Sequence, residues 1–204
     1  MTDNTDKNSN KSNDLTKLIT ALGNERKIPP LDKWTPETIT PFDIVIDDNG
    51  EWYHDGVKIA RQSLVDLFAS VLWADVDGEQ KRHFLKTPTD KYEITVIDTP
   101  LFINTVDKIT KNGDDWIVFG TTNGDSIVLD GEPLYFKTVV RDDVADDRLY
   151  IDTRFNLTAR IGRNVFYHLI ELGELSDEQG QTVLTLQSGG KIHRVIAPNF
   201  NQKN

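Results

Sequence analysis

The sequence predicts an α+β fold, mostly antiparallel sheet, with two β-rich halves that each carry one helix. Apolar and polar residues alternate along much of the chain from residue 42 to residue 140, which is typical of half-buried strands. Dipeptides that favour tight turns, such as Asp55-Gly56 and Asn123-Gly124, separate these segments. After residue 42 the apolar period becomes helical at 63–73 and at 164–172. A barrel made only of strands is the alternative architecture.

The N-terminal region is expected to contribute little to the sheet. Residues 1–14 are polar after Met1 and cannot bury enough surface to offset the entropy of ordering them, so we expect a disordered tail. Leu15, Leu18 and Leu22 recur at helical spacing before Gly23, which predicts a short helix. Four prolines then predict an extended connector. Residues 15–41 are therefore expected to form a helix and a Pro-rich connector.

The two β-rich halves are placed at 42–105 and 106–204. Phe42, Ile44 and Ile46 alternate before a turn at 48–50, which predicts a β-hairpin ahead of the first helix. The acidic segment 141–147 is expected to be a loop, and the second helix should end at Gly173. The expected strands are 42–46, 51–54, 92–97, 102–106, 116–119, 126–129, 134–140, 149–155, 182–187 and 191–196.

The chain also repeats itself. A shift of about 102 positions, the difference between residues 59 and 161, places Tyr53 on Phe155, Lys58 on Arg160 and Arg61 on Arg163. A shift of about 98 positions aligns ITVIDTPLF at residue 94 with IHRVIAPNF at residue 192. Because the two matches occur in the same order with nearly equal offsets, we interpret the halves as a duplicated unit separated by a four-residue deletion.

Composition limits the class of partner and the compartment. The chain has 33 acidic and 23 basic residues, a net charge of −10, which works against binding to nucleic acid or to an anionic membrane. It has no cysteine, which excludes disulfides and thiolate catalysis. The first residues lack the features of a signal peptide, and the longest apolar segment, 64–74, is interrupted by Asp66. We therefore expect a cytoplasmic protein with no nucleic-acid or membrane partner.

Three segments resemble a family of bacterial proteins of unknown function. They are DIVIDDNGEWYHDGVKIAR, FLKTPTDKYEITVIDTPLF and TRFNLTARIGRNVFYHLIEL, and they occur in this order within residues 40–200. The resemblance implies a duplicated β-rich core, a C-terminal half similar to pleckstrin-homology-like folds, and a nucleotide-like ligand between the halves. It also implies a role in signal transduction, and it implies no enzymatic mechanism.

The arginines are the strongest candidates for a binding site. Four of the nine arginines fall within one short stretch: Arg148, Arg154, Arg160 and Arg163. Arg163 stands at the start of the second helix, and Arg61 occupies the equivalent place before the first. Guanidinium groups match the geometry of phosphate, so Arg61, Arg160 and Arg163 are predicted to bind an anion. The alternative is that these arginines tie each helix to the adjoining hairpin through carbonyls or carboxylates.

Four other residues belong to the predicted ligand site. Lys86 and Thr87 are placed in the same cleft as the arginines. Trp52 and Tyr53, on the hairpin near Arg61, are expected first as core residues, and stacking of one of these rings on a purine of the ligand is the alternative.

No catalytic, metal or cofactor signature is found. The acidic segments at 47–51 and 142–147 match no metal-binding loop, and the four histidines lack the spacing of a zinc protease. Glycines 120, 124 and 131 form neither of the phosphate-binding glycine patterns. We therefore expect a non-enzymatic protein that senses a small anion, and the family resemblance implies that this anion is nucleotide-like. The alternatives are a protein-interaction module without a small ligand, and a metal-dependent nucleotide hydrolase.

Overall fold

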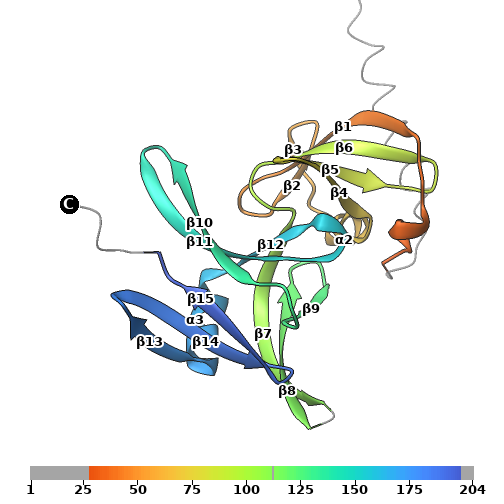
Figure 1. The fold of residues 1–204 in the computed structure, drawn as a ribbon. Helices are drawn as coiled ribbons and strands as arrows, with labels where there is room; N and C mark the ends of the chain where they lie inside the picture. Colours follow the sequence, from red (N-terminus) through yellow and green to blue (C-terminus); the bar gives the residue numbers. More distant parts are fainter. Residues whose placement is uncertain (1–27, 112, 199–204) are drawn as a thin grey trace, which may run out of the picture. The chain divides into compact units, whose positions relative to one another are not determined.

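The structure is a computed structural model that describes residues 28–111 and 113–198 (Figure 1). The predicted tail and the predicted N-terminal helix lie outside the described residues. The described chain divides into two compact units. Unit 1 contains residues 28–45 and 52–95, and unit 2 contains residues 46–51 and 96–198.

Unit 1 is built on a six-stranded sheet with the order β3-β2-β1-β6-β5-β4. The amide of Ile97 donates to the carbonyl oxygen of Ile46 (2.9 Å) where β6 and β1 end, so these two central strands run in the same direction. Strand β2 pairs with β3, β4 with β5 and β5 with β6, all antiparallel. The elements are η1 (Leu31–Lys33), β1 (Thr38–Ile46), β2 (Trp52–His54), β3 (Val57–Lys58), α2 (Gln62–Ser70), β4 (Leu72–Asp77), β5 (Gln80–Lys86) and β6 (Asp90–Val96).

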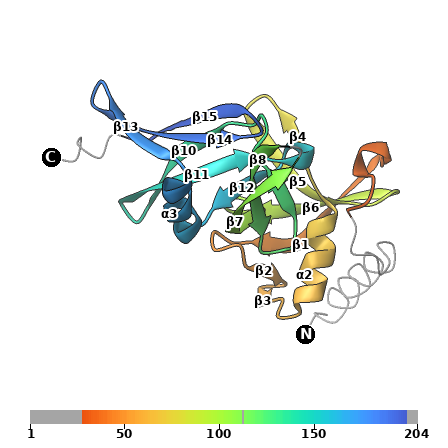
Figure 2. The same cartoon turned by 90° about the horizontal axis from the view of Figure 1, so that it is seen from below.

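Helix α2 covers part of this sheet (Figure 2), and its buried face includes Val65, Phe68 and Ala69. The Phe68 ring stacks on Trp52 of β2, with 6.1 Å between the ring centres. The helix was predicted to continue to residue 73, but it ends at Ser70. Leu72 and Ala74 are fully buried on alternate positions of β4, so pairing with β5 takes these residues into the sheet.

The Pro-rich connector ends earlier than predicted. Strand β1 begins at Thr38 and includes Pro41, which the sequence placed in the connector. Proline is tolerated in a sheet where its missing N–H is not needed by a neighbouring strand. Because β2 has three residues and β1 has nine, the first part of β1 has no partner on the β2 side.

Unit 2 contains a second six-stranded sheet, with the order β10-β11-β12-β7-β8-β9, and a separate three-stranded sheet, β13-β14-β15. Strands β12 and β7 pair in parallel at the centre of the larger sheet. The Phe166 ring of α3 packs edge-on against Phe136 of β10. The elements are β7 (Leu101–Lys111), β8 (Asp114–Thr121), β9 (Ser126–Val128), β10 (Leu134–Arg141), β11 (Val144–Asp152), η2 (Arg154–Asn156), β12 (Thr158–Ile161), α3 (Arg163–Leu172), β13 (Glu174–Glu178), β14 (Gln181–Ser188) and β15 (Lys191–Ile196).

The two six-stranded sheets share one topology. Each is made of six strands that are consecutive in the chain, and in each the first and sixth strands lie side by side in the middle. The predicted α+β class, with mostly β content and one helix per half, is therefore confirmed, and the parallel pair makes both sheets mixed.

A second structural repeat, shorter than the six-stranded sheets, corresponds to the internal match found in the sequence. Strand β3, helix α2 and three antiparallel strands occur in the same order as β12, α3 and three antiparallel strands. Lys58 pairs with Tyr53 across one hairpin, and Arg160 pairs with Tyr150 across the other. The sequence alignment of Tyr53 with Phe155 was wrong, because Phe155 lies in the longer turn between β11 and β12.

Two segments of unit 2 differ from the prediction. The acidic segment 141–147 was predicted to be a loop, but only Asp142 and Asp143 form a turn. Arg141 ends β10 and pairs with Val144, the first residue of β11. Asp142 and Asp143 have φ of 46° and 62°, a conformation that Asp and Asn adopt more readily than most residues. Strand β13 was not predicted because all five of its residues are exposed, and pairing with β14 is what makes it a strand.

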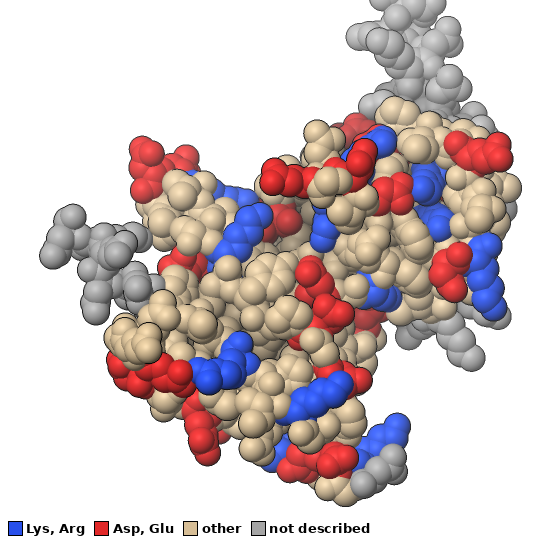
Figure 3. Space-filling model, in the orientation of Figure 1, with Lys and Arg blue, Asp and Glu red and all other residues tan. Residues whose placement is uncertain are grey.

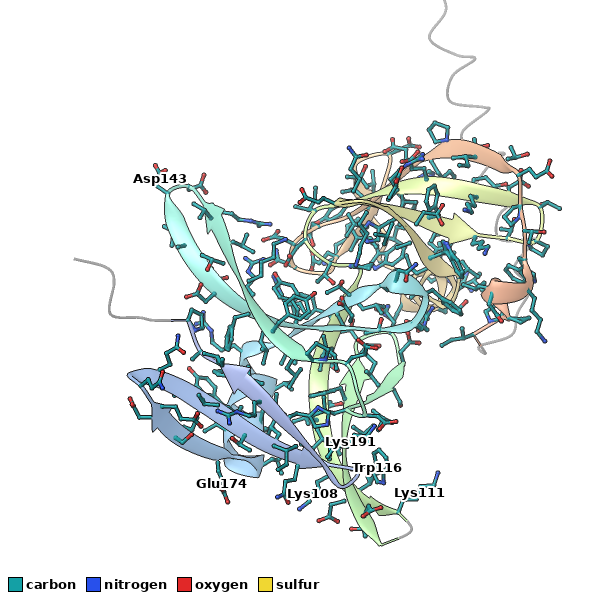
Figure 4. All side chains as sticks on the ribbon, viewed as in Figure 1. Lys108, Lys111, Trp116, Asp143, Glu174 and Lys191 are labelled. Carbon is teal, nitrogen blue, oxygen red and sulfur yellow. The ribbon has the colours of Figure 1, made fainter. Side chains whose placement is uncertain are left out.

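The turn between β14 and β15 provides a stability prediction. Gly189 has φ of 57°, and its amide donates to the carbonyl oxygen of Asp115 (2.8 Å). A Cβ atom at Gly189 would overlap the Trp116 ring, which is labelled in Figure 4. Gly189→Ala is therefore expected to lower the free energy of unfolding by about 2 kcal/mol, measured by urea denaturation.

Gly131→Ala is the matched control, because a Cβ at Gly131 meets nothing within 4 Å and its φ is not positive. We expect this control to change stability by less than about 0.5 kcal/mol. Equal effects of the two substitutions would contradict the role assigned to the Trp116 contact.

Candidate functional site

Alternation along β11 and β12 places basic and aromatic side chains on one face of the sheet in unit 2. Arg148 and Tyr150 are two residues apart on β11, and Tyr150 pairs with Arg160 on β12. Leu149 and Ile151 point to the opposite face, where they are buried. The strand period therefore separates an apolar face from a charged one.

Asp98 connects the three polar side chains of this face. Its carboxylate accepts hydrogen bonds from Arg148 Nη1 (2.8 Å), Arg160 Nη1 (3.0 Å) and the Tyr150 hydroxyl (2.7 Å). The Asp98 side chain is 5% exposed, and the side chains of Arg148 and Arg160 are each 13% exposed. Burial, followed by the hydrogen bond to Asp98, raises the pKa of Tyr150, so this phenol stays protonated. Two buried guanidinium groups thus share one buried carboxylate.

Arg148 contacts two further carboxylates. Its Nε donates to Asp146 Oδ2 (2.7 Å), and its Nη2 lies 4.0 Å from Asp48 Oδ2. Asp48 also forms an ion pair with Arg141 at the end of β10. The hydrogen-bonding edges of Arg148 are therefore largely occupied.

Arg160 has fewer hydrogen-bond and ion-pair partners than Arg148 among the described residues. Its guanidinium lies 4.0 Å from the centre of the Phe102 ring, so one planar face is covered. Among the described residues, its one hydrogen bond goes to the Asp98 carboxylate that it shares with Arg148. Burial and the repulsion from Arg148 lower the pKa of Arg160. N–H groups remain on Arg160 that an additional anion would satisfy.

Arg163 begins α3, directly after β12 and Gly162. The amide of Gly162 donates to the carbonyl oxygen of Ile103 (2.9 Å), and a Cβ at Gly162 would lie only 2.9 Å from that oxygen. Glycine thus allows the helix to begin close to β7. Within 28–111 and 113–198, the exposed Arg163 side chain has no hydrogen bond or ion pair.

The charges of the three arginines meet at Asp146. The hydrogen bond from Arg148 is the main cause of a lowered pKa at Asp146, and attraction to Arg148, Arg163 and Arg160 lowers it further. We call Arg148, Arg160 and Arg163 the arginine cluster. Its members come from β11, β12 and α3, whereas Arg61, which the sequence grouped with Arg160 and Arg163, belongs to unit 1.

The other predicted site residues belong to unit 1. Arg61 is exposed, and its Nε donates to the Ser63 hydroxyl (3.0 Å) at the start of α2. The Thr87 side chain is 1% exposed and closes the turn before β6 through hydrogen bonds with the backbone of Asp90 (3.0 Å). Thr87 is therefore a structural turn residue with no surface to offer a ligand.

Lys86 and Trp52 are also buried rather than placed in a cleft. The side chain of Lys86 is 4% exposed, and its Nζ lies 3.5 Å from the centre of the Trp73 ring. Burial and the charge of Lys91 lower the pKa of Lys86. Trp52 is 2% exposed against Phe68, so no face of its ring is open to a purine. Tyr53 is half-buried and pairs with Lys58.

The sequence missed several partners of the arginine cluster. Asp98, Tyr150 and Phe102 were not singled out, and Asp146 was assigned to a loop. The alternation of Asp146, Arg148 and Tyr150 along β11 was a signal that could have placed them on one face. Asp98 had no comparable local signal, because it meets Arg148 and Arg160 over separations of 50 and 62 residues.

Unit 1 has a shallow pocket of about 460 Å³ that none of the predicted site residues lines. The Phe42 ring in its wall stacks on His54, with 5.6 Å between ring centres. His54 Nδ1 lies 2.8 Å from the carbonyl oxygen of Asp43. The lining residues are Pro41, Phe42, Asp43, His54, Glu93, Ile94 and Thr95.

The visible surface carries interspersed acidic and basic side chains, without a large area of one sign (Figure 3). Within the described ranges, no group of three or more His, Asp or Glu side chains is arranged to hold a metal ion. None of the described helices is long and apolar enough to cross a membrane.

Comparison with known proteins identifies the family. Residues 29–99 match the model for the N-terminal domain of a "domain of unknown function (DUF1285)", and residues 100–195 match the model for the C-terminal domain of a "protein of unknown function (DUF1285)". No curated protein matches the chain.

Two solved structures are similar. A DUF1285 family protein from Silicibacter pomeroyi DSS-3 is 28% identical, with a TM-score of 0.72 over 88% of this chain and 94% of that one. A DUF1285 family protein from Shewanella baltica OS155 is 22% identical, with a TM-score of 0.47 over 63% of this chain and 91% of that one. The resemblance found in the sequence is thus confirmed at the level of the family. Two consecutive domain matches spanning residues 29–195, with the Silicibacter structure in support, show that the chain belongs to the DUF1285 family.

Proposed function

We propose that this protein is a non-enzymatic sensor of a small, nucleotide-like anion in bacterial signal transduction, and that the arginine cluster of unit 2 holds the anion. The observation that carries the proposal is the pair of guanidinium groups, Arg148 and Arg160, that the Asp98 carboxylate holds together, with Asp146 bonded to Arg148. Arg160 keeps N–H groups beyond its hydrogen bond to Asp98, and Arg163 makes no hydrogen bond or ion pair within the described residues.

The chemistry of the cluster favours phosphate. Guanidinium groups donate two hydrogen bonds in a fixed plane, which suits the oxygens of a phosphoryl group. Phe102 covers one face of Arg160 and leaves its edge to donate. Asp98 holds Arg148 and Arg160 in place before a ligand arrives, so little side-chain entropy would be lost on binding.

Replacing Arg163 with alanine distinguishes a ligand-binding role of the arginine cluster from a purely structural one. Because its side chain is exposed and has no hydrogen bond or ion pair within the described residues, Arg163→Ala should change the free energy of unfolding by less than about 0.5 kcal/mol. Binding should weaken at least about tenfold, since a charge-assisted contact is lost. The measurement is a thermal-shift titration with mono-, di- and cyclic nucleotides, with and without magnesium.

Arg61→Ala is the matched control, because Arg61 is also an exposed arginine at a helix start but lies in unit 1. It should bind nucleotide as the wild type does. If Arg163→Ala binds as tightly as the wild type, or if no nucleotide raises the melting temperature of the wild type, the arginine cluster is a structural ion-pair network.

A protein-interaction module remains the second candidate, supported by strand β13. This strand lies at the edge of the three-stranded sheet, and all five of its residues are exposed. An exposed edge can accept a strand from a partner, and the pleckstrin-homology-like character proposed for the C-terminal part fits such a use. Stoichiometric co-purification of one protein with the wild type, lost in Leu175→Lys, would support this candidate. Equal recovery by both would count against it.

A further inference from the structure

We propose that the Asp146 carboxylate is an internal occupant of the anion site and that the site takes a phosphoryl dianion in exchange for it. This inference rests on the proposed function. It adds a substrate class, phosphoryl groups rather than carboxylates, and a regulatory element, a carboxylate of the chain itself that competes with the ligand.

The two carboxylates of the arginine cluster have different freedom. Asp98 is 5% exposed and accepts three hydrogen bonds, so it is a fixed part of the site. The Asp146 side chain is 43% exposed and accepts one hydrogen bond, from Arg148 Nε (2.7 Å). Rotation about its side-chain bonds would take the Asp146 carboxylate into water while β11 stays in place.

Asp146 occupies the Nε edge of Arg148, whose Nη1 is bonded to the carboxylate that also holds Arg160. The hydrogen bond from Arg148 and the attraction of Arg148, Arg163 and Arg160 lower the pKa of Asp146, in keeping with a place that favours an anion. An external anion that replaces the carboxylate would inherit the hydrogen bond from Arg148 Nε. The N–H groups of Arg160 that Asp98 does not take are the next donors for it.

The exchange discriminates between classes of anion. A ligand carboxylate has one charge and two oxygens, so it would merely replace an equivalent group that is already tethered to the site. A phosphoryl group carries nearly two charges and three terminal oxygens, so it can engage three guanidinium groups at once. We therefore expect a monovalent anion to compete poorly with the Asp146 carboxylate, and a phosphoryl dianion to displace it.

The test is isothermal titration of the full chain with inorganic phosphate and, separately, with acetate. Asp146→Asn removes the competing charge and keeps an oxygen that can accept from Arg148 Nε. We expect this variant to bind phosphate about tenfold more tightly than the wild type, because one opposing charge close to the site is gone. The wild type should not bind acetate, whereas Asp146→Asn, which lacks the competing carboxylate, should bind it weakly.

Asp143→Asn is the matched control. Asp143 is exposed at the tip of the same hairpin (Figure 4), and Asn tolerates its positive φ of 62°. This control changes the net charge equally and should leave phosphate binding within about twofold of the wild type. If both variants tighten binding equally, the effect is one of net charge, and the internal-occupant role is wrong.

The remaining outcomes separate the inference from the proposed function. If the wild type binds phosphate and Asp146→Asn binds no more tightly, Asp146 does not compete, while the anion site stands. If Asp146→Asn alone binds, the internal occupant is confirmed in its strongest form. If none of the three proteins binds phosphate and the wild type binds no nucleotide, both the inference and the proposed function fail.

Discussion

Replacing Asp98 with alanine is expected to lower the free energy of unfolding by about 3–5 kcal/mol, the cost of removing one member of a buried ion-pair network. The substitution would leave Arg148 and Arg160 without the carboxylate that they share, and both side chains are 13% exposed. It would also leave the buried hydroxyl of Tyr150 without its acceptor. Urea denaturation followed by tryptophan fluorescence and circular dichroism measures the loss.

Asp107→Ala is the control for this substitution. Asp107 lies on β7 and is exposed, so its removal should cost less than about 0.5 kcal/mol. A loss below about 1 kcal/mol for Asp98→Ala would mean that the two arginines find other acceptors or reach water. In that case the preorganisation assigned to Asp98 in the binding site would also be wrong.

Acidification from pH 6.5 to pH 4 is expected to remove about 3 kcal/mol of stability through His83, which pairs with Ala74 and Ile94 in the sheet of unit 1. Its buried Nε2 has no hydrogen-bond partner among the residues described. Burial, and secondarily the charge of Lys81, lowers its pKa to about 4. The folded protein therefore holds this histidine neutral.

The direction follows from the two pKa values of His83. In the unfolded chain the imidazole titrates near its ordinary pKa of about 6.5, so below that pH the unfolded state takes up a proton that the folded state does not. The stability contribution is fully present above pH 6.5 and is lost as the pH falls towards 4. His83→Leu should remove this component when unfolding free energies are measured by urea denaturation at several pH values.

His168→Gln provides the comparison, because His168 is exposed on α3 and its replacement should leave the wild-type pH profile unchanged. Some slope should persist in His83→Leu, since burial also lowers the pKa of His193 and many carboxylates titrate in the same range. A profile for His83→Leu that parallels the wild type would show that His83 is protonated without disturbing the fold.

Local patterns predicted the elements that depend on neighbouring residues. The final strand was predicted at 191–196 and is β15, Lys191–Ile196, because its alternation is regular and two glycines precede it. The second helix begins one residue before the predicted start and ends at Leu172, followed by Gly173. The proximity of Arg160 and Arg163 could also be predicted from the sequence, because only Ile161 and Gly162 separate them in the chain.

Elements that depend on a distant partner were missed or misjudged. Strand β13 has an exposed, polar sequence and exists through its pairing with β14. The end of α2 was placed too late because apolar residues continue past Ser70, and burial against β5 turns them into a strand. Lys86, Thr87 and Trp52 were predicted for a ligand site, but their positions in the sheet and the turn bury them.

The sequence by itself determined the family, the mostly β character and the concentration of arginines near one strand–helix junction. The family rests on the resemblance of three segments to known proteins, and the other two rest on composition or on residues close together in the chain. Only the tertiary structure decided that Asp98 joins Arg148 and Arg160. The physical reason is that strand order sets which distant residues meet, and local periodicity carries no information about that order.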